Sequence, residues 1–200
     1  DFYLVKVEGV QVDQSRPAPL FTRIVGPSPQ TRAARKTKQE LDEKDQARYE
    51  FFDQLLDRVS DRTRRFDGVS PGPRRDVSAS GGRGYSFGFS VSRNESRAFL
   101  YMHFGSTQTV NDAAFEVFEK HHEEIESSVD YDLEWVQDEN RRRLIRYVVG
   151  VGYEDEDRWE EGHEKLARSM AQLEEAVGPY LDRAREAADR RAEEEAQETT

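Results

Sequence analysis

The sequence predicts an α+β fold: an antiparallel sheet of two hairpins with a helix between them (a ββαββ core), flanked by a long N-terminal helix and a long C-terminal helix. Three observations support this prediction. Residues 85–91 alternate between apolar and small polar side chains, the apolar period becomes helical after Thr109, and a regular apolar stripe runs through residues 159–184. A helix that joins two hairpins is expected to cover one face of their sheet.

The strands of both hairpins are predicted from a period of two residues. In residues 85–91 one face is aromatic or β-branched, and the other consists of serine and glycine. A polar turn at 93–96 leads into residues 99–102, which are apolar on both faces. Residues 133–137 and 144–151 predict the second hairpin, with a polar turn between them.

Helical spacing predicts one helix before this core and one inside it. The first is expected over residues 39–66, with an apolar side that would pack on the sheet: Tyr49, Phe52, Leu55, Leu56, Val59 and Phe66. The second is expected to begin at Thr109 and to present one side to the core: Phe115, Phe118, His122 and Ile125.

The C-terminal helix has the most regular pattern of the chain. Its apolar residues recur at alternating spacings of four and three: Trp159, His163, Leu166, Met170, Leu173, Val177, Tyr180 and Ala184. Gly178 and Pro179 fall inside this stripe and should bend or break the helix. Packing against the chain's own sheet is the favoured interpretation of the stripe, and a coiled coil with a second copy is the alternative.

Four segments follow from these patterns. Residues 1–26 read as three short strands without a covering helix, so we expect them to be the closing strands of an upstream domain. Residues 27–38 are expected to be a linker, residues 39–187 the α+β domain, and residues 188–200 a disordered acidic tail. The loop expected at 68–84 is rich in Gly, Pro, Ser and Arg and is either a binding loop or a flexible one.

Composition excludes several classes of protein. The absence of cysteine excludes disulfides and zinc sites of the finger type, and no apolar run reaches the length of a membrane span. We therefore expect a cytoplasmic protein without a membrane partner. The net charge of −11 is uneven, because residues 1–110 carry +4 and residues 111–200 carry −15. A polyanion is expected to bind the first part or the sheet.

No catalytic constellation stands out, so an enzymatic activity of this chain is left uncertain. The Asp42-Glu43-Lys44 run lies in a predicted helix, where Asp42 and Lys44 point in different directions. His121 and His122 are helical neighbours about 100° apart and cannot share one metal ion. No cofactor is predicted for this chain, and no glycine-rich phosphate loop is present in the order strand, loop, helix.

The candidate functional residues are arginines with one nearby tyrosine. Guanidinium groups contact phosphates, and aromatic rings stack on bases. The set proposed for nucleic-acid binding comprises Arg74, Arg75, Arg83, Tyr85, Arg93, Arg97, Arg141, Arg142, Arg143 and Arg146. Because 24 of the 30 basic residues are arginines, ordinary surface arginines in an arginine-rich sequence are an equally good interpretation.

The order of motifs resembles a known family. FYLVKVEGVQVDQSRPAPLF, YEFF, FGFSVSRNESRAFLYM, FEVFEKHHEEIE, LEWV and DRWEE follow one another along the chain. This order is similar to an uncharacterised C-terminal domain of prokaryotic proteins whose N-terminal half is a PD-(D/E)XK, restriction-endonuclease-like domain. The resemblance implies a non-catalytic accessory domain that engages DNA in restriction or anti-phage defence.

The same resemblance places any nuclease motif, and any Mg²⁺ that it holds, upstream of this chain. A homo-oligomer or a partner protein is also expected, with contact through the apolar stripe of residues 159–184 or through an exposed edge of the sheet. The alternative function is a protein-interaction or dimerisation module that makes no nucleic-acid contact of its own.

Overall fold

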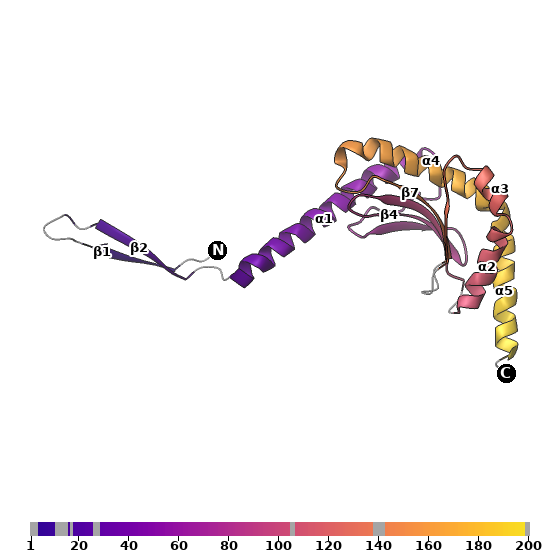
Figure 1. Ribbon diagram of the computed structural model, residues 1–200, viewed down its shortest axis with the longest axis horizontal. Helices are drawn as coiled ribbons and strands as arrows, with labels where there is room; N and C mark the ends of the chain where they lie inside the picture. The colour runs from indigo at the N-terminus through magenta and orange to yellow at the C-terminus, as the bar shows by residue number, and fades with distance from the viewer. Residues whose placement is uncertain are drawn as a thin grey trace. The chain divides into compact units, whose positions relative to one another are not determined.

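The computed structural model describes residues 4–10, 16, 18–25, 29–104, 107–137 and 143–198 (Figure 1). These residues form two compact units, residues 1–43 and residues 44–200, and each is described by itself.

The first unit contains two strands, β1 (Leu4–Val10) and β2 (Ala18–Val25). They pair antiparallel, with Val7 opposite Phe21. The first and third of the three expected strands are therefore present. The middle one was expected at residues 10–15, of which Val10 is the last residue of β1 and the others lie outside the described residues.

Helix α1 (Pro29–Ser60) begins in the first unit and ends in the second. The prediction of a linker at 27–38 was wrong from residue 29 onward, because the helix starts ten residues before the expected position. Proline is well tolerated at the first helical position, and the residues that follow are rich in Ala, Arg, Lys, Gln and Glu, which all favour helix.

The end of α1 also differs from the prediction. The helix ends at Ser60, where the backbone N–H groups of Arg62 and Thr63 both donate to the carbonyl of Val59. Phe66 reaches the core from the following turn and lies 4.9 Å from Phe89, measured between ring centroids. Tyr49 is 42% exposed. The buried side of the helix consists instead of Phe51, Phe52, Leu55 and Val59.

The second unit is built on a five-stranded antiparallel sheet in the order β3-β4-β5-β7-β6. Its strands are β3 (Asp76–Ser80), β4 (Tyr85–Val91), β5 (Ser96–Met102), β6 (Glu134–Gln137) and β7 (Arg143–Val149). The predicted α+β class with an antiparallel sheet is confirmed.

The predicted arrangement of two hairpins lacked one strand. β3 lies in the segment that was expected to be a loop, and it pairs with β4 so that Val77 stands opposite Phe89. Only Val77 and Ala79 of this strand are apolar, which is too weak a pattern to identify a strand from sequence. The tight connection to β4 uses Gly82 and Gly84 with φ of 118° and 89°, a region that side chains disfavour.

The described helices that contact the sheet lie on one of its faces. Helices α2 (Gln108–Glu119) and α4 (Trp159–Val177) both contact β5 and β7, and Figure 1 shows α4 lying across the sheet. The single helix expected from Thr109 is divided, because the chain turns at Lys120 and His121 before α3 (His122–Ser127). A short 3-10 helix, η1 (Glu156–Arg158), precedes α4.

The C-terminal stripe packs inside its own domain, as the favoured interpretation predicted. Every residue of the stripe is buried. The expected bend is also present, because a 3-10 helix, η2 (Gly178–Tyr180), separates α4 from α5 (Leu181–Glu198). A coiled coil along this stripe would have to compete with the core for the same side chains.

The prediction of a disordered tail from residue 188 was wrong, because α5 remains helical to Glu198. The helix packs along α2 and buries Ala184 and Ala188. Near its end, the carboxylate of Glu195 accepts hydrogen bonds from the hydroxyls of Thr107 and Thr109, beside the first turn of α2. An acidic side chain at this position also interacts favourably with the helix dipole.

Removal of residues 189–200 should therefore loosen the start of α2. We expect the amide protons of residues 108–112 to exchange faster with solvent in the truncated chain. The start of α2 then loses the hydrogen bonds that Thr107 and Thr109 donate to Glu195, together with the last part of α5. Hydrogen exchange with mass spectrometry measures this change, and the amides of β4 serve as the internal control. Unchanged exchange at residues 108–112 would contradict the supporting role of the tail.

Candidate functional site

The sheet face opposite the helices is the candidate site. Along β4 and β5 every second residue faces away from the helices. These residues are partly exposed while their neighbours are buried, except that Gly88 is itself buried beneath Phe99. We call this surface the open face. Its central residues are Ser78, Ser86, Gly88, Ser90, Arg97, Phe99, Tyr101, Leu144 and Arg146.

Register brings these residues side by side. Phe99 on β5 stands opposite Gly88 on one neighbouring strand and Arg146 on the other. A Cβ atom at Gly88 would lie 2.5 Å from Cζ of Phe99, so the tip of the ring rests directly over the glycine. Glycine is therefore required at position 88 for the ring to lie down on the sheet.

A hollow of about 570 Å³ opens on this face. The strand β4 contributes only small side chains to it, Ser86 and Ser90, whereas β5 contributes large ones. Its remaining lining residues come from β3, from β7 and from the residues beside the strands: Arg75, Asp76, Ser78, His103, Leu144 and Arg146. A volume of this size lies in the range of pockets that hold small ligands or parts of larger ones.

The charges of the hollow differ from those of the chain as a whole. Three arginines and one aspartate line it, a net charge of +2, whereas the whole chain carries −11. Arg97 is ion-paired with Glu95, and Nε of Arg146 lies 2.7 Å from a carboxylate oxygen of Glu134. The arginine side chains remain 21% and 28% exposed, so each retains surface that a ligand can contact.

The structure brings together three of the arginines that the sequence analysis selected. Arg75, Arg97 and Arg146 all line the hollow. Arg74 lines an adjoining groove formed by residues 69–78. The side chains of Arg141, Arg142 and Arg143 lie outside the described residues.

The other selected residues point elsewhere. Arg83 is ion-paired with Asp189 at 2.8 Å, and Arg93 is ion-paired with Glu154 at 3.1 Å. Tyr85 is only 4% exposed, with its ring packed near Phe104, so its selection for base stacking does not fit the structure. Tyr85 and the core residue Phe87 are two residues apart on β4, so their side chains point to the same, buried face of the sheet.

The sequence analysis missed Phe99, Tyr101 and His103, which line the hollow. Residues 99–102 looked apolar on both faces, which concealed the exposed one. The signal lay in the neighbouring strand: the Ser-Gly-Ser face of β4 is too small to bury these aromatic residues once the two strands pair.

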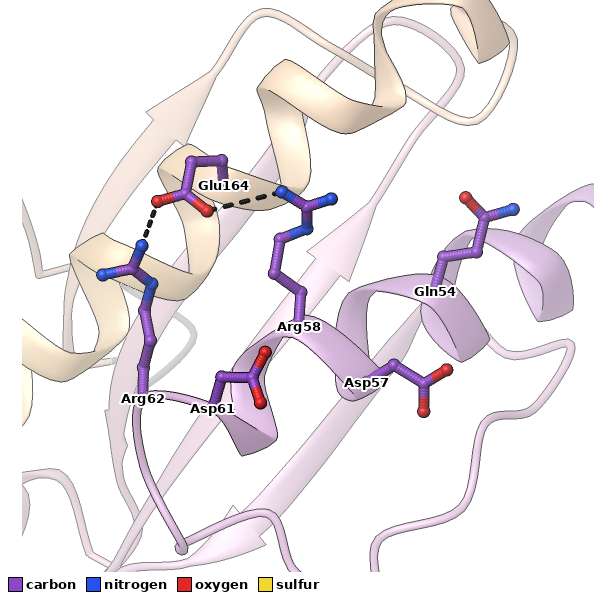
Figure 2. A pocket seen from close by; sticks show the side chains of 6 residues that line it. All are labelled: Gln54, Asp57, Arg58, Asp61, Arg62 and Glu164. Carbon is purple, nitrogen blue, oxygen red and sulfur yellow. Dashed lines mark hydrogen bonds and ion pairs between the residues drawn. The ribbon is translucent and has the colours of Figure 1, made fainter.

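A second hollow, of about 710 Å³, lies between the end of α1 and α4 (Figure 2). Arg58 and Arg62 both turn toward Glu164, with Nη1 of Arg58 3.5 Å from its carboxylate. Asp57 and Asp61 also line this hollow. With three acidic and two basic side chains gathered across the helices, the cluster is suited to holding α1 against α4 rather than to attracting an anion.

The adjacent histidines face different partners. His121 stacks on Tyr180 with ring centroids 4.3 Å apart, whereas His122 lies 4.6 Å from Trp135 and 3.2 Å from a carboxylate oxygen of Glu126. Within the described residues, no three His, Asp or Glu side chains gather closely enough to hold a metal ion.

Across the same residues, no helix combines the length and the apolar character needed to cross a membrane.

Comparison with known proteins gives one match. Residues 47–181 match the model of a protein family described as a domain of unknown function, DUF4268. The matched region contains the whole five-stranded sheet and helices α2 to α4, and therefore the open face. No curated protein and no solved structure matches the chain. The family description names no activity, so the association with nucleases implied by the motif order stays a hypothesis.

Proposed function

This chain belongs to the DUF4268 family, and we propose that it is a non-catalytic accessory domain that binds DNA through the open face of its sheet. One observation carries the proposal. On the sheet face opposite the helices, Arg97 precedes the partly exposed rings of Phe99 and Tyr101 along β5, and Arg146 stands opposite Phe99 on the adjacent strand β7. Guanidinium groups beside exposed aromatic rings are the common elements of nucleic-acid-binding surfaces.

The electrostatics favour modest affinity. The hollow is positive, but the chain is strongly acidic, and both Arg97 and Arg146 already have carboxylate partners. A phosphate has to compete with Glu95 and Glu134 for these guanidinium groups. Binding is therefore expected to be weak and to depend steeply on salt concentration, because phosphate contacts release counterions.

The motif order supports a setting in restriction or anti-phage defence, in which a nuclease-like domain elsewhere in the protein supplies catalysis and its metal ion. The alternative, a protein-interaction or dimerisation module, loses one of its two surfaces, because the C-terminal stripe is buried. The sheet edges β3 and β6 would have to provide that contact.

Replacing Arg97 and Arg146 together by glutamine should weaken binding to DNA and reduce the salt dependence. Removing one arginine–phosphate interaction should lower the slope of log affinity against log salt by about one. Fluorescence anisotropy with labelled DNA over a series of salt concentrations measures both quantities. Arg168→Gln is the control, because Arg168 lies on α4 and is paired with Asp130 at 3.0 Å.

The control variant removes one positive charge from the helical side of the domain, so it should leave the slope unchanged. Equal weakening by both variants would indicate a general charge effect and would contradict binding at the open face. The absence of any DNA binding by the parent chain at low salt would favour the protein-interaction module.

A further inference from the structure

We propose that the nucleic acid on the open face is single-stranded, with unpaired bases stacked on Phe99 and Tyr101. This inference rests on the proposed function and names the form of nucleic acid that the same surface accepts. It follows from the order of side chains along β5, from the small side chains of β4, and from the distribution of charge.

Strand β5 and the residue after it present an unbroken row of planar groups. Arg97, Phe99, Tyr101 and His103 occupy every second position and line the same hollow. Positions two apart on a strand are separated by about 6.6–6.8 Å, which leaves room for a base against each ring. The rings of Tyr101 and His103 are 5.8 Å apart and tilted by 34°, so they form a continuous platform.

The neighbouring strand leaves space beside this row. Ser86, Gly88 and Ser90 present no bulky side chain, and the Phe99 ring lies down over the glycine. The serine hydroxyls can donate to or accept from the edge of a base. The faces of a base are accessible to aromatic rings only when the base is unstacked, because a duplex hides these faces in its stack.

Charge also favours one strand over two. A duplex carries one phosphate charge for about every 1.7 Å of its axis, which a chain of net charge −11 repels strongly. Arg97 and Arg146 provide two cations close to the aromatic row. This number suits the backbone of one short strand, and stacking then supplies affinity that does not depend on sequence.

The test compares a labelled dT oligonucleotide of about 12 nucleotides with a duplex of the same length, using the full chain and fluorescence anisotropy. We expect tighter binding of the single strand. Phe99→Leu and Tyr101→Leu should each weaken binding of dT by about tenfold, because leucine retains apolar bulk without a stacking face. Tyr101→Phe keeps the ring and should bind as the parent does.

Tyr49→Leu is the matched control, because Tyr49 is an exposed aromatic residue on α1, away from the open face. Thermal unfolding of each variant identifies any that lose the fold. An rU oligonucleotide distinguishes RNA from DNA as the source of the strand, since stacking accepts either. Preferential binding of rU would support the platform and move the proposed function from DNA to RNA.

Three results would overturn the inference. Tighter binding of the duplex, or dT binding that is abolished in the Arg97→Gln, Arg146→Gln variant but unchanged in both leucine variants, would leave the proposed DNA function intact and exclude base stacking. Failure of both the single strand and the duplex to bind at low salt would exclude the proposed function as well.

Discussion

Gly152→Ala should lower the free energy of unfolding by about 3 kcal/mol, because the site is overpacked by a single added carbon. A Cβ atom at Gly152 would lie inside the contact distance of three backbone atoms, the carbonyl carbon and oxygen of Arg93 and the nitrogen of Asn94. These atoms cannot turn aside as a flexible side chain would. The backbone N–H groups of Tyr153 and Glu154 donate to Ser92 and Arg93 and hold the two segments together.

Urea unfolding measures this effect, and Gly150→Ala is its control. Gly150 is two residues away and exposed, and a Cβ atom there meets nothing within 4 Å. Its substitution should change the unfolding free energy by no more than about 0.5 kcal/mol. Equal effects of the two substitutions would show that the close approach at Gly152 is not important for stability.

The same substitution should disturb the open face. The 92–95 turn that Gly152 packs against carries Glu95, the ion-pair partner of Arg97. If the turn moves, Arg97 loses the group that orients it.

Acidification from pH 7 to pH 4 should remove about 3 kcal/mol of stability through His163. The side chain is 2% exposed and packs among aromatic rings, with the ring of Phe51 4.5 Å away. Burial, followed by the positive charge of Arg58, lowers the pKa of His163 from 6.5 to about 4. The folded state therefore binds a proton less readily than the unfolded state between these two values.

Because the folded pKa is the lower one, this stability is fully present above pH 6.5 and is lost as the pH falls toward 4. Urea unfolding at several pH values measures the loss, and His163→Leu should remove this part of the dependence. The difference between parent and variant isolates His163 from the carboxylates, which titrate in both. A parallel pH profile for His163→Leu and the parent would contradict the argument.

Several elements could be predicted from local patterns alone. Strand β4 alternates aromatic and small residues, and the helical stripe from Trp159 to Ala184 repeats over several turns. In both cases one face of a regular element is buried. The residues on that face therefore recur at a fixed spacing along the sequence, which makes the element recognisable. The bend at Gly178 and Pro179 is equally local, because it depends on the backbone chemistry of those two residues.

Other elements depended on contacts that the local pattern does not contain. Strand β3 has only Val77 and Ala79 to indicate a strand, and its pairing with β4 makes it one. The part of helix α5 from residue 188 onward looked like a charged, disordered tail, yet packing of α5 along α2, with Ala188 buried, stabilises it. Short helices and weak strands gain most of their stability from packing, so their sequence carries little signal.

The candidate site shows the same division. Composition and charge predicted a binding role for arginines near the sheet, and Arg75, Arg97 and Arg146 line the same hollow on the open face. Phe99 and Tyr101 became candidates only through register, which sets them between the Ser-Gly-Ser face of β4 and the arginine of β7. Local order in the chain sets which face of each strand is apolar, whereas pairing between distant strands sets which side chains become neighbours. The open face is a product of that pairing, since its residues come from four strands separated along the chain by loops and helices.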